Sequence, residues 1–312
     1  MKDLRVVFMG TPLFAVPILD SLIKNTNVLL VVCQPDKEKD KKGNIVFSEV
    51  KKLALENNIE VFQPTKIKEE YAKILEKEPD IIITCAYGQI VPDILLNYPK
   101  YKCINVHASL LPKLRGGAPI HWALINGLEE TGVTVMYMDS KMDNGDIISS
   151  KSIPILKEDI LDTLYFKLSI LGRDLLMETL PNIISGNIKI MKQNEEEVTF
   201  GFNIKKEEEH IDFSKKSREV YNLVRGLNSD PGAYFIMNDL RVKVYEVEIL
   251  EKEYQGEIGQ IVDVLKHGFV VKTKDGAVLI KDIKIEGKKR IKTVDYLNGL
   301  KDKFSLMGII LK

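Results

Sequence analysis

The residues best suited to chemistry lie in one short stretch and one later loop. Asn105 and His107 stand two positions apart at the end of an apolar run, and Asp143 lies in the sequence Met-Asp-Asn-Gly-Asp. Because successive side chains of a strand point to opposite faces, Asn105 and His107 are expected to emerge on one face. Histidine exchanges a proton near neutral pH, an amide donates hydrogen bonds without charge, and a carboxylate can orient and charge an imidazole. Acyl transfer needs these groups, so we predict that all three residues are catalytic.

Each of these residues also has an ordinary structural interpretation. A lone histidine near a strand is often held by backbone groups, and an aspartate before Asn-Gly is often a turn residue. The sequence around them decides between the two interpretations, and it favours catalysis, as the longer strings below indicate.

The elements that must position these groups follow from the apolar pattern. Short runs rich in Val and Ile alternate with amphipathic stretches, which is typical of a parallel sheet covered by helices on both faces. The expected strands are residues 4–8, 28–33, 81–85, 103–106 and 133–138. Side chains at the carboxyl ends of such strands face the ligand crevice of an α/β sheet. Gly10-Thr11-Pro12 predicts a Rossmann-like strand-to-helix turn, but without the G-x-G-x-x-G fingerprint it does not indicate a dinucleotide.

The second half of the chain indicates a separate, smaller domain. An amphipathic helix is expected over 160–180, and Pro181 and then Ser185-Gly186-Asn187 should end it. A polar stretch without sustained periodicity is interpreted as a linker, and a helix over 214–226 follows. Short alternating segments with frequent Gly turns then favour a small β-barrel or sandwich. These segments lie around Tyr234 and over 242–247, 258–264, 269–272 and 278–285.

We therefore predict three parts along the chain. Residues 1–190 should form an α/β domain with a Rossmann-like parallel sheet, residues 191–209 a linker, and residues 210–312 a small β-barrel domain.

The composition is that of a folded globular protein and argues against several other classes of protein. The chain has 312 residues, 45% of them hydrophobic and 29% charged, which is ordinary for a folded chain of about two domains. Lys plus Arg and Asp plus Glu number 45 each, so any nucleic-acid surface must be a local patch. The separated Cys33, Cys85 and Cys103 indicate neither a disulfide framework nor a zinc site, and we expect no metal. Without a signal-peptide pattern or a membrane-length apolar run, the expected location is the cytoplasm.

Longer strings place the candidate residues in a known pattern. Asn-x-His-x-Ser-Leu-Leu-Pro over 105–112, followed by Asp-x-Gly over 143–145, resembles the signature of the 10-formyltetrahydrofolate-using transferases. Further strings resemble successive landmarks of the methionyl-tRNA formyltransferase family. They are residues 8–14 (Phe-Met-Gly-Thr-Pro-x-Phe), 34–36 (Gln-Pro-Asp), 86–92 (Ala-Tyr-Gly-Gln-Ile-Val-Pro), 115–119 (Arg-Gly-Gly-Ala-Pro), 131–135 (Thr-Gly-Val-Thr-Val) and 231–234 (Pro-Gly-Ala-Tyr). The first and last of them lie in different predicted domains, so the resemblance covers most of the chain.

This resemblance implies a function and a set of roles. The implied reaction transfers the formyl group of 10-formyltetrahydrofolate, a co-substrate, to the free amino group of methionine on initiator methionyl-tRNA. The implied fold is a Rossmann-like catalytic domain joined to an OB-like barrel that binds tRNA. The residues in the catalytic positions are again Asn105, His107 and Asp143, and those that help to form the folate site are Ser109, Leu110, Leu111 and Pro112.

Two basic stretches are the candidates for contact with tRNA. The first follows the Gln-Pro-Asp string, over residues 37–43. The family typically has a loop with Gly and Arg there, which the resemblance places near the acceptor stem. This chain has lysines and acidic residues there, and lysine lacks the bidentate fork of arginine. The second stretch, over 281–292, has six positive and two negative residues; solvated surface loops are the alternative for both. The residues assigned to tRNA are Lys37, Lys39, Lys41 and Lys42 in the first stretch and Lys288, Lys289 and Arg290 in the second.

Other functions stay open on the sequence. A sugar-nucleotide formyltransferase resembles this chain in its catalytic strings and can carry a barrel-like second domain, but it needs no tRNA surface. A glycinamide-ribonucleotide transformylase normally lacks the second domain, and a formyltetrahydrofolate dehydrogenase needs a large downstream domain. A non-catalytic RNA-binding module is disfavoured, because Asn105, His107 and Asp143 are all present.

Overall fold

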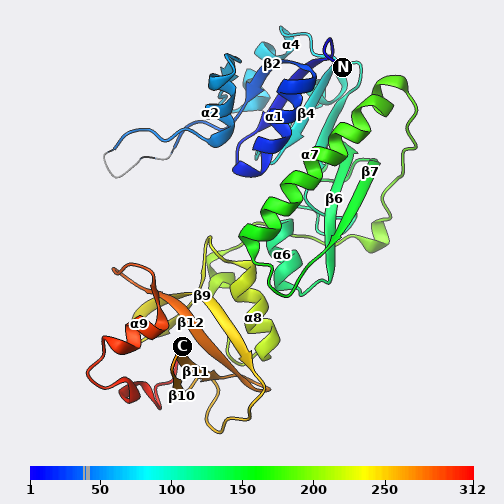
Figure 1. Ribbon diagram of the computed structural model, residues 1–312. Helices are drawn as coiled ribbons and strands as arrows, with labels where there is room; N and C mark the ends of the chain where they lie inside the picture. The colour runs from blue at the N-terminus through cyan, green and yellow to red at the C-terminus, as the bar shows by residue number, and fades with distance from the viewer. Residues whose placement is uncertain (38, 40–42) are drawn as a thin grey trace. The chain divides into compact units, whose positions relative to one another are not determined.

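The computed structural model describes residues 1–37, 39 and 43–312, and the chain forms two compact units (Figure 1). The first unit contains Met1–Pro119, Glu130–Pro154 and Tyr165–Phe202, and the second contains Ile120–Glu129, Ile155–Leu164 and Asn203–Lys312. A search of the described residues finds no helix with both the length and the apolar character that crossing a membrane requires. The domain bounds expected from the sequence stay a prediction.

A seven-stranded sheet lies at the centre of the first unit, in the order β3-β2-β1-β4-β5-β6-β7. Its strands are β1 Arg5–Gly10, β2 Asn27–Val32, β3 Val61–Phe62, β4 Ile81–Cys85, β5 Cys103–His107, β6 Glu130–Tyr137 and β7 Ile147–Pro154. The strands β1 to β5 are parallel, as the apolar runs predict. Residues 6–9 of β1 and all of β4 are buried, which explains why they are continuously apolar rather than alternating.

One edge of this sheet differs from the prediction. The apolar runs place β6 in a parallel sheet, but β6 pairs antiparallel with β5, and β7 returns antiparallel beside it. The expectation was wrong for β6 because apolar composition reports burial and carries no information on strand direction. Antiparallel neighbours need no crossover helix, so a short return over residues 138–146 joins β6 to β7.

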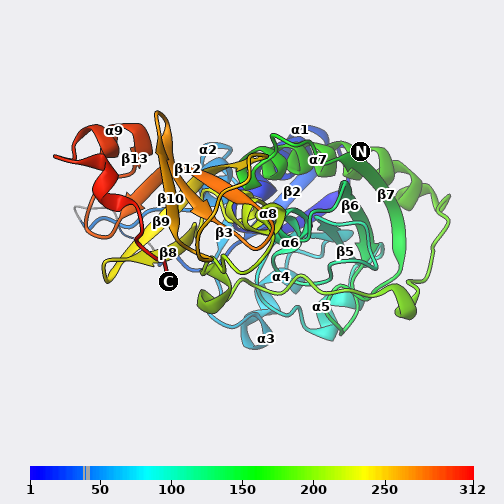
Figure 2. The same cartoon turned by 90° about the horizontal axis from the view of Figure 1, so that it is seen from below.

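Helices cover both faces of the sheet. Figure 2 shows α1 and α7 on one side of the strands and α3, α4 and α5 on the other. Gly172 brings α7 close to the sheet and to α1, since a Cβ there would lie 3.0 Å from Val106 and 3.6 Å from Ile18. On the opposite face, Val7 and Met9 pack in one apolar cluster with residues of α3, α4 and α5. The helices up to this point are η1 Leu13–Ala15, α1 Val16–Asn25, α2 Glu49–Glu56, α3 Ile67–Glu70, α4 Ala72–Leu75, α5 Asp93–Asn97, α6 Pro119–Ile125 and α7 Leu161–Ser185.

The helix α7 is longer than the sequence predicts. Pro181 should end it, because proline donates no backbone N–H and crowds the preceding turn, yet α7 continues to Ser185. Pro181 is exposed, so water can satisfy the carbonyl that loses its partner. The helix ends before Gly186, whose φ of +73° is the left-handed conformation favoured after a helix C-terminus.

The second unit is built on an antiparallel sheet with the order β10-β11-β12-β9-β8, and β13 pairs with β12. Its strands are β8 Ala233–Met237, β9 Leu240–Leu250, β10 Ile261–Leu265, β11 Gly268–Lys272, β12 Ala277–Ile285 and β13 Ile291–Lys292. The short strands and the helix that the sequence predicts in this region are present, the helix being α8 Ser217–Gly226. The remaining helices are η2 Glu195–Glu197, η3 Lys206–Glu209, α9 Thr293–Asn298 and η4 Lys303–Leu306.

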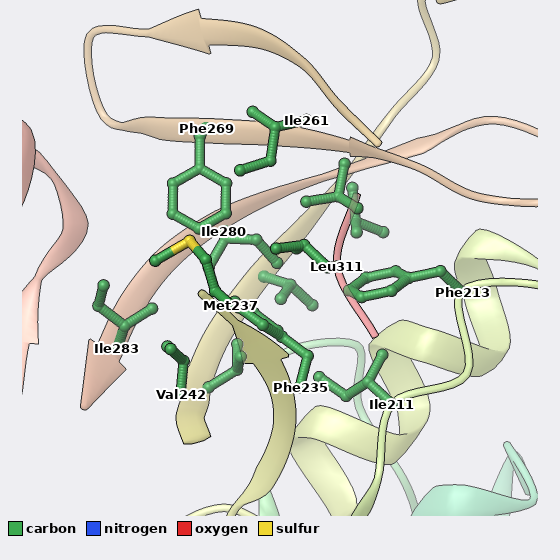
Figure 3. Packing of buried hydrophobic residues seen from close by; sticks show 14 of the residues in the cluster. Ile211, Phe213, Phe235, Met237, Val242, Ile261, Phe269, Ile280, Ile283 and Leu311 are labelled. Carbon is green, nitrogen blue, oxygen red and sulfur yellow. The ribbon is translucent and has the colours of Figure 1, made fainter. Parts of the chain in front are cut away.

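Aromatic rings lie at the centre of the core of this unit (Figure 3). The ring centroid of Phe235 lies 5.9 Å from that of Phe213 and 6.4 Å from that of Phe269. The last residues of the chain bridge the two outer strands: the N–H of Gly308 donates to the carbonyl of residue 261 in β10, and the N–H of residue 236 in β8 donates to Lys312. The C-terminal segment therefore forms hydrogen bonds to both outer strands of the sheet, β10 and β8.

The cysteine thiols are expected to be unreactive in the folded protein. Cys33, Cys85 and Cys103 are buried and free. Burial raises the pKa of the Cys33 thiol to about 11 and raises the pKa of the other two thiols well above their ordinary value. Because the thiolate is the reactive form, an aromatic disulfide reagent should label none of them at neutral pH and all of them in guanidinium. Rapid labelling of the folded protein would contradict this packing.

Candidate active site

The carboxyl end of β5 carries the two predicted side chains. Asn105 and His107 both belong to β5, and Thr84 of the parallel neighbour β4 stands opposite Asn105 in the register. The Thr84 hydroxyl donates to Oδ1 of Asn105 at 2.8 Å. This bond uses the amide oxygen, so the Nδ2 donor of Asn105 lies toward Asp143, with 3.5 Å between Nδ2 and Oδ1.

The imidazole of His107 is buried, with 6% of the residue exposed. Its Nε2 lies 3.0 Å from the carbonyl oxygen of Leu114. Since a carbonyl only accepts, Nε2 carries the proton of this bond. The other ring nitrogen, Nδ1, lies 3.7 Å from Oδ1 of Asp143. That distance is too long for a hydrogen bond, but the carboxylate is close enough to stabilise positive charge on the ring.

Asp143 reaches this pair from the return between β6 and β7. Its φ of +50° lies in the left-handed region, where Asn and Asp are among the few tolerated side chains. Its Oδ2 accepts a hydrogen bond of 2.8 Å from the backbone N–H of Gly116. Gly145 makes the turn possible, because a Cβ there would lie 1.9 Å from the carbonyl oxygen of Tyr137. The carboxylate therefore ties the β6–β7 return to the loop that follows β5.

The fold thus brings the Asn105 amide and the His107 imidazole beside the Asp143 carboxylate, as the sequence predicts. A neutral amide donor, an imidazole and a carboxylate in this arrangement can stabilise charge on an oxygen and pass a proton between two atoms. Among the described residues, no group of three or more His, Cys, Asp or Glu side chains is suited to hold a metal ion. The catalytic assignment of Asn105, His107 and Asp143 stays a prediction.

Residues 109–112, predicted to help form the folate site, form the turn after β5. The Ser109 hydroxyl, 1% exposed, donates to a backbone carbonyl within the same turn at 2.6 Å. Leu111 packs in a small apolar cluster with residues of β6 and β7. Ser109 and Leu111 therefore point into the protein and hold the turn, whereas Leu110 and Pro112 are partly exposed.

A segment that lies within the expected linker packs beside the candidate site; we call residues 191–202 the strap. At its start, the backbone of Met191 pairs with β7 in both directions, at 2.8 and 2.9 Å. Further along, the carbonyl of Thr199 accepts from the N–H of Arg115 at 2.9 Å, and the N–H of Gly201 donates to the Arg115 carbonyl at 2.8 Å. Sequence reasoning missed the strap because backbone pairing of a polar segment leaves no apolar period to detect.

The first basic stretch is described only in part. Its neighbour Asp36 forms a partly buried ion pair with Lys51 of α2, which anchors the start of the stretch. The side chains of the described members are exposed, which suits contact with a phosphate. Those members are Lys37 and Lys39, whereas Lys41 and Lys42 lie outside the described residues.

Much of the charge in the second basic stretch is paired within its own unit. Arg290 donates to both carboxylate oxygens of Asp282, at 2.9 and 3.1 Å, and these bonds raise the pKa of Arg290. Lys281 and Lys292 both pair with Glu246 of β9, at 3.0 and 2.7 Å. The sequence count missed Glu246 because it stands far from the stretch in the chain and meets it only through the sheet.

Two of the lysines assigned to tRNA in this stretch keep their charge available. Lys288 and Lys289 are exposed, and neither forms an ion pair with another described residue. With Arg290 they line a cavity of about 430 Å³ beside α9. Of the residues assigned to tRNA in the second unit, these two lysines are therefore better placed to neutralise a phosphate than Arg290 is.

Comparison with known proteins finds relatives over almost the whole chain. The formyl transferase family model matches residues 4–180, and the model of the formyl transferase C-terminal domain matches residues 203–301. The methionyl-tRNA formyltransferase of Bacillus licheniformis is 48% identical over 95% of this chain and 95% of its own length. That of Malacoplasma penetrans is 44% identical over 96% of this chain and 94% of its own length. The solved structure of the N-formyltransferase from Helicobacter canadensis, in complex with folinic acid and dTDP-3-aminofucose, has a similar fold, with a TM-score of 0.66 at 24% identity, covering 90% of this chain and 99% of its own.

Proposed function

The chain belongs to the methionyl-tRNA formyltransferase family, and from this premise we propose that it transfers the formyl group of 10-formyltetrahydrofolate to the methionine amino group of initiator methionyl-tRNA. Its product would be the formylated tRNA used in translation initiation. Relatives of 44% to 48% identity that bear this name support the choice of substrate. The observation that supports this chemistry is that the Asn105 amide and the His107 imidazole both lie beside the Asp143 carboxylate.

In the proposed reaction, the amine nitrogen bonds to the formyl carbon and the bond from that carbon to the folate nitrogen breaks. An α-amino group titrates at a pKa of about 7.7 to 8.0, so its neutral form is available near neutral pH. As the carbonyl becomes tetrahedral, its oxygen gains negative charge, which the Asn105 amide and a protonated His107 would stabilise. Asp143 favours the protonated imidazole and helps a proton to pass from the attacking amine to the departing folate nitrogen.

The folate co-substrate is proposed to contact the turn over residues 109–112. Its backbone is fixed by the Ser109 hydroxyl and by the packing of Leu111, so it offers a rigid wall next to β5. The partly exposed Leu110 and Pro112 supply apolar surface on that wall. A preformed apolar surface with few polar groups is the usual character of a small-molecule site.

The second unit is proposed to be an OB-like barrel that binds tRNA. The bridging of β8 and β10 by the C-terminal segment supports closure of the sheet, since closure leaves no free edge strand. Lys288 and Lys289 supply charge for phosphates, a kind of contact that carries no base sequence information. The proposed location is the cytoplasm, where translation supplies the charged tRNA.

The direct test of this function is a choice of acceptor. The enzyme with 10-formyltetrahydrofolate should formylate charged initiator tRNA and leave an amino-sugar nucleotide unmodified, as followed by the mass of each acceptor.

His107→Ala and Asn105→Ala should each lower kcat on the order of a hundredfold, since losing one donor to a developing oxyanion costs about 3 kcal/mol. Formylation of the sugar nucleotide alone would establish the rival function, and near-normal kcat in either variant would remove that residue from the mechanism.

A second prediction concerns the two available lysines. Reversing both, Lys288→Glu with Lys289→Glu, should raise the KM for tRNA and flatten its dependence on salt, because fewer phosphate counterions are released on binding. The KM for folate should not change. The matched control is Lys266→Glu with Lys274→Glu, which alters the charge equally at exposed positions elsewhere in the unit. Equal effects of the two double variants would remove Lys288 and Lys289 from the tRNA surface.

A further inference from the structure

We propose that Gln193 is a positioning residue for formyl transfer, acting through the backbone of the turn that presents Asp143. The inference rests on the proposed function, because it assumes that Asp143 takes part in the reaction. It concerns a residue of the strap, which the sequence analysis assigns to a linker without a role in catalysis. The contacts that support it all lie within the first unit.

The side-chain amide of Gln193 spans the Asp143 turn. Its Nε2 donates to the carbonyl oxygens of Asp143 and Gly145, both at 2.8 Å. These two carbonyls stand on either side of residue 144, so one amide group holds both ends of the turn. A non-glycine residue in the left-handed region persists only where its surroundings fix it. The two bonds from Gln193 supply such a restraint at Asp143, whose φ is +50°.

Arg115 fixes which way the amide points. Its Nε donates to Oε1 of Gln193 at 3.0 Å. Because arginine has only donors, the oxygen of the amide must face it, and both N–H groups are then directed to the turn. The guanidinium itself is held by Glu195 of the strap at 2.9 Å, with the Arg115 side chain 5% exposed. Rotation of the Gln193 amide would therefore break a partly buried, charge-assisted contact.

The strap holds both partners of the bond that places the carboxylate. Gly116, which donates to Oδ2 of Asp143 at 2.8 Å, directly follows Arg115. The backbone of Arg115 is paired with Thr199 and Gly201 of the strap. The strap thus holds Asp143 through the bond from Gln193 to its backbone carbonyl. It holds Gly116 through the backbone pairing of the preceding residue, Arg115. The separation of the carboxylate from Asn105 and His107 follows from these contacts.

The test compares Gln193→Ala and Gln193→Glu with a matched control. Glutamate has nearly the shape of glutamine but no N–H donors, so both variants should fail if the two donated bonds are what matters. Asn194→Ala is the control, because among the described residues the Asn194 amide forms hydrogen bonds to Glu196 and Glu197 inside the strap alone. Both Gln193 variants should lower kcat on the order of tenfold to a hundredfold, the cost of misplacing a reacting group by a fraction of an ångström to an ångström. The KM for tRNA should stay close to wild type in the Gln193 variants, and so should kcat in the control.

A double-variant cycle asks whether Gln193 acts through Asp143. In the Asp143→Asn background, Gln193→Ala should lower kcat by less than about twofold, since groups that act as a unit are not additive. A full additional loss would show that Gln193 acts elsewhere and would overturn the proposal. Wild-type kcat in both Gln193 variants, or an equal loss in Asn194→Ala, would overturn it as well.

A readout without substrate separates this inference from the proposed function. The Gly116 N–H is bonded to the Asp143 carboxylate, so its hydrogen exchange should be faster in both Gln193 variants and unchanged in Asn194→Ala. Unchanged Gly116 exchange would overturn the positioning role whatever the enzyme formylates. Faster exchange in a protein that formylates no tRNA would support the positioning role while the proposed substrate fails.

Discussion

The carboxylate of Asp143 is the interaction on which the candidate site depends. One oxygen accepts the Gly116 N–H at 2.8 Å, and the other lies 3.5 Å from the Asn105 amide nitrogen and 3.7 Å from Nδ1 of His107. A hydrogen bond to a charged acceptor contributes about 1.5 to 3 kcal/mol, and this one is shielded, since the Asp143 side chain is 16% exposed. The carboxylate therefore brings three segments together: the loop after β5 through the Gly116 bond, the β6–β7 return that carries Asp143, and the end of β5 through Asn105 and His107.

The antiparallel pairing of β6 with β5 explains why several contacts are needed to place the Asp143 carboxylate. Because β6 runs opposite to β5, it ends near the start of β5, where the N–H of Met138 donates to the Cys103 carbonyl at 2.9 Å. The β6–β7 return must then fold back over β5 to bring Asp143 to His107. Gly145 gives it the necessary close approach to β6, and the strap holds it in place. Sheet direction, turn geometry and strap thus act together to place a carboxylate beside the imidazole.

The sequence predicts the cluster of Asn105, His107 and Asp143 and most strands, and the features it misses share a physical cause. Asn105 and His107 are predictable because strand alternation is a local rule. The direction of β6, the pairing of the strap with Arg115 and the ion pair of Arg290 with Asp282 depend instead on which segments meet in space. Pro181 shows the same limit, since its tolerance within α7 follows from its exposure and not from its own preference.

Asp143 is proposed to contribute negative charge as well as geometry, and Asp143→Asn separates the two contributions. Asparagine keeps an oxygen that can accept the Gly116 N–H, so the free energy of unfolding should fall by only about 1 kcal/mol, the difference between a charged and a neutral acceptor. It removes the negative charge that lies 3.7 Å from the imidazole, so kcat for formylation of charged initiator tRNA should fall on the order of a hundredfold. A variant that is as stable as wild type and retains kcat within about twofold would contradict the account, because it would make Asp143 only a turn residue.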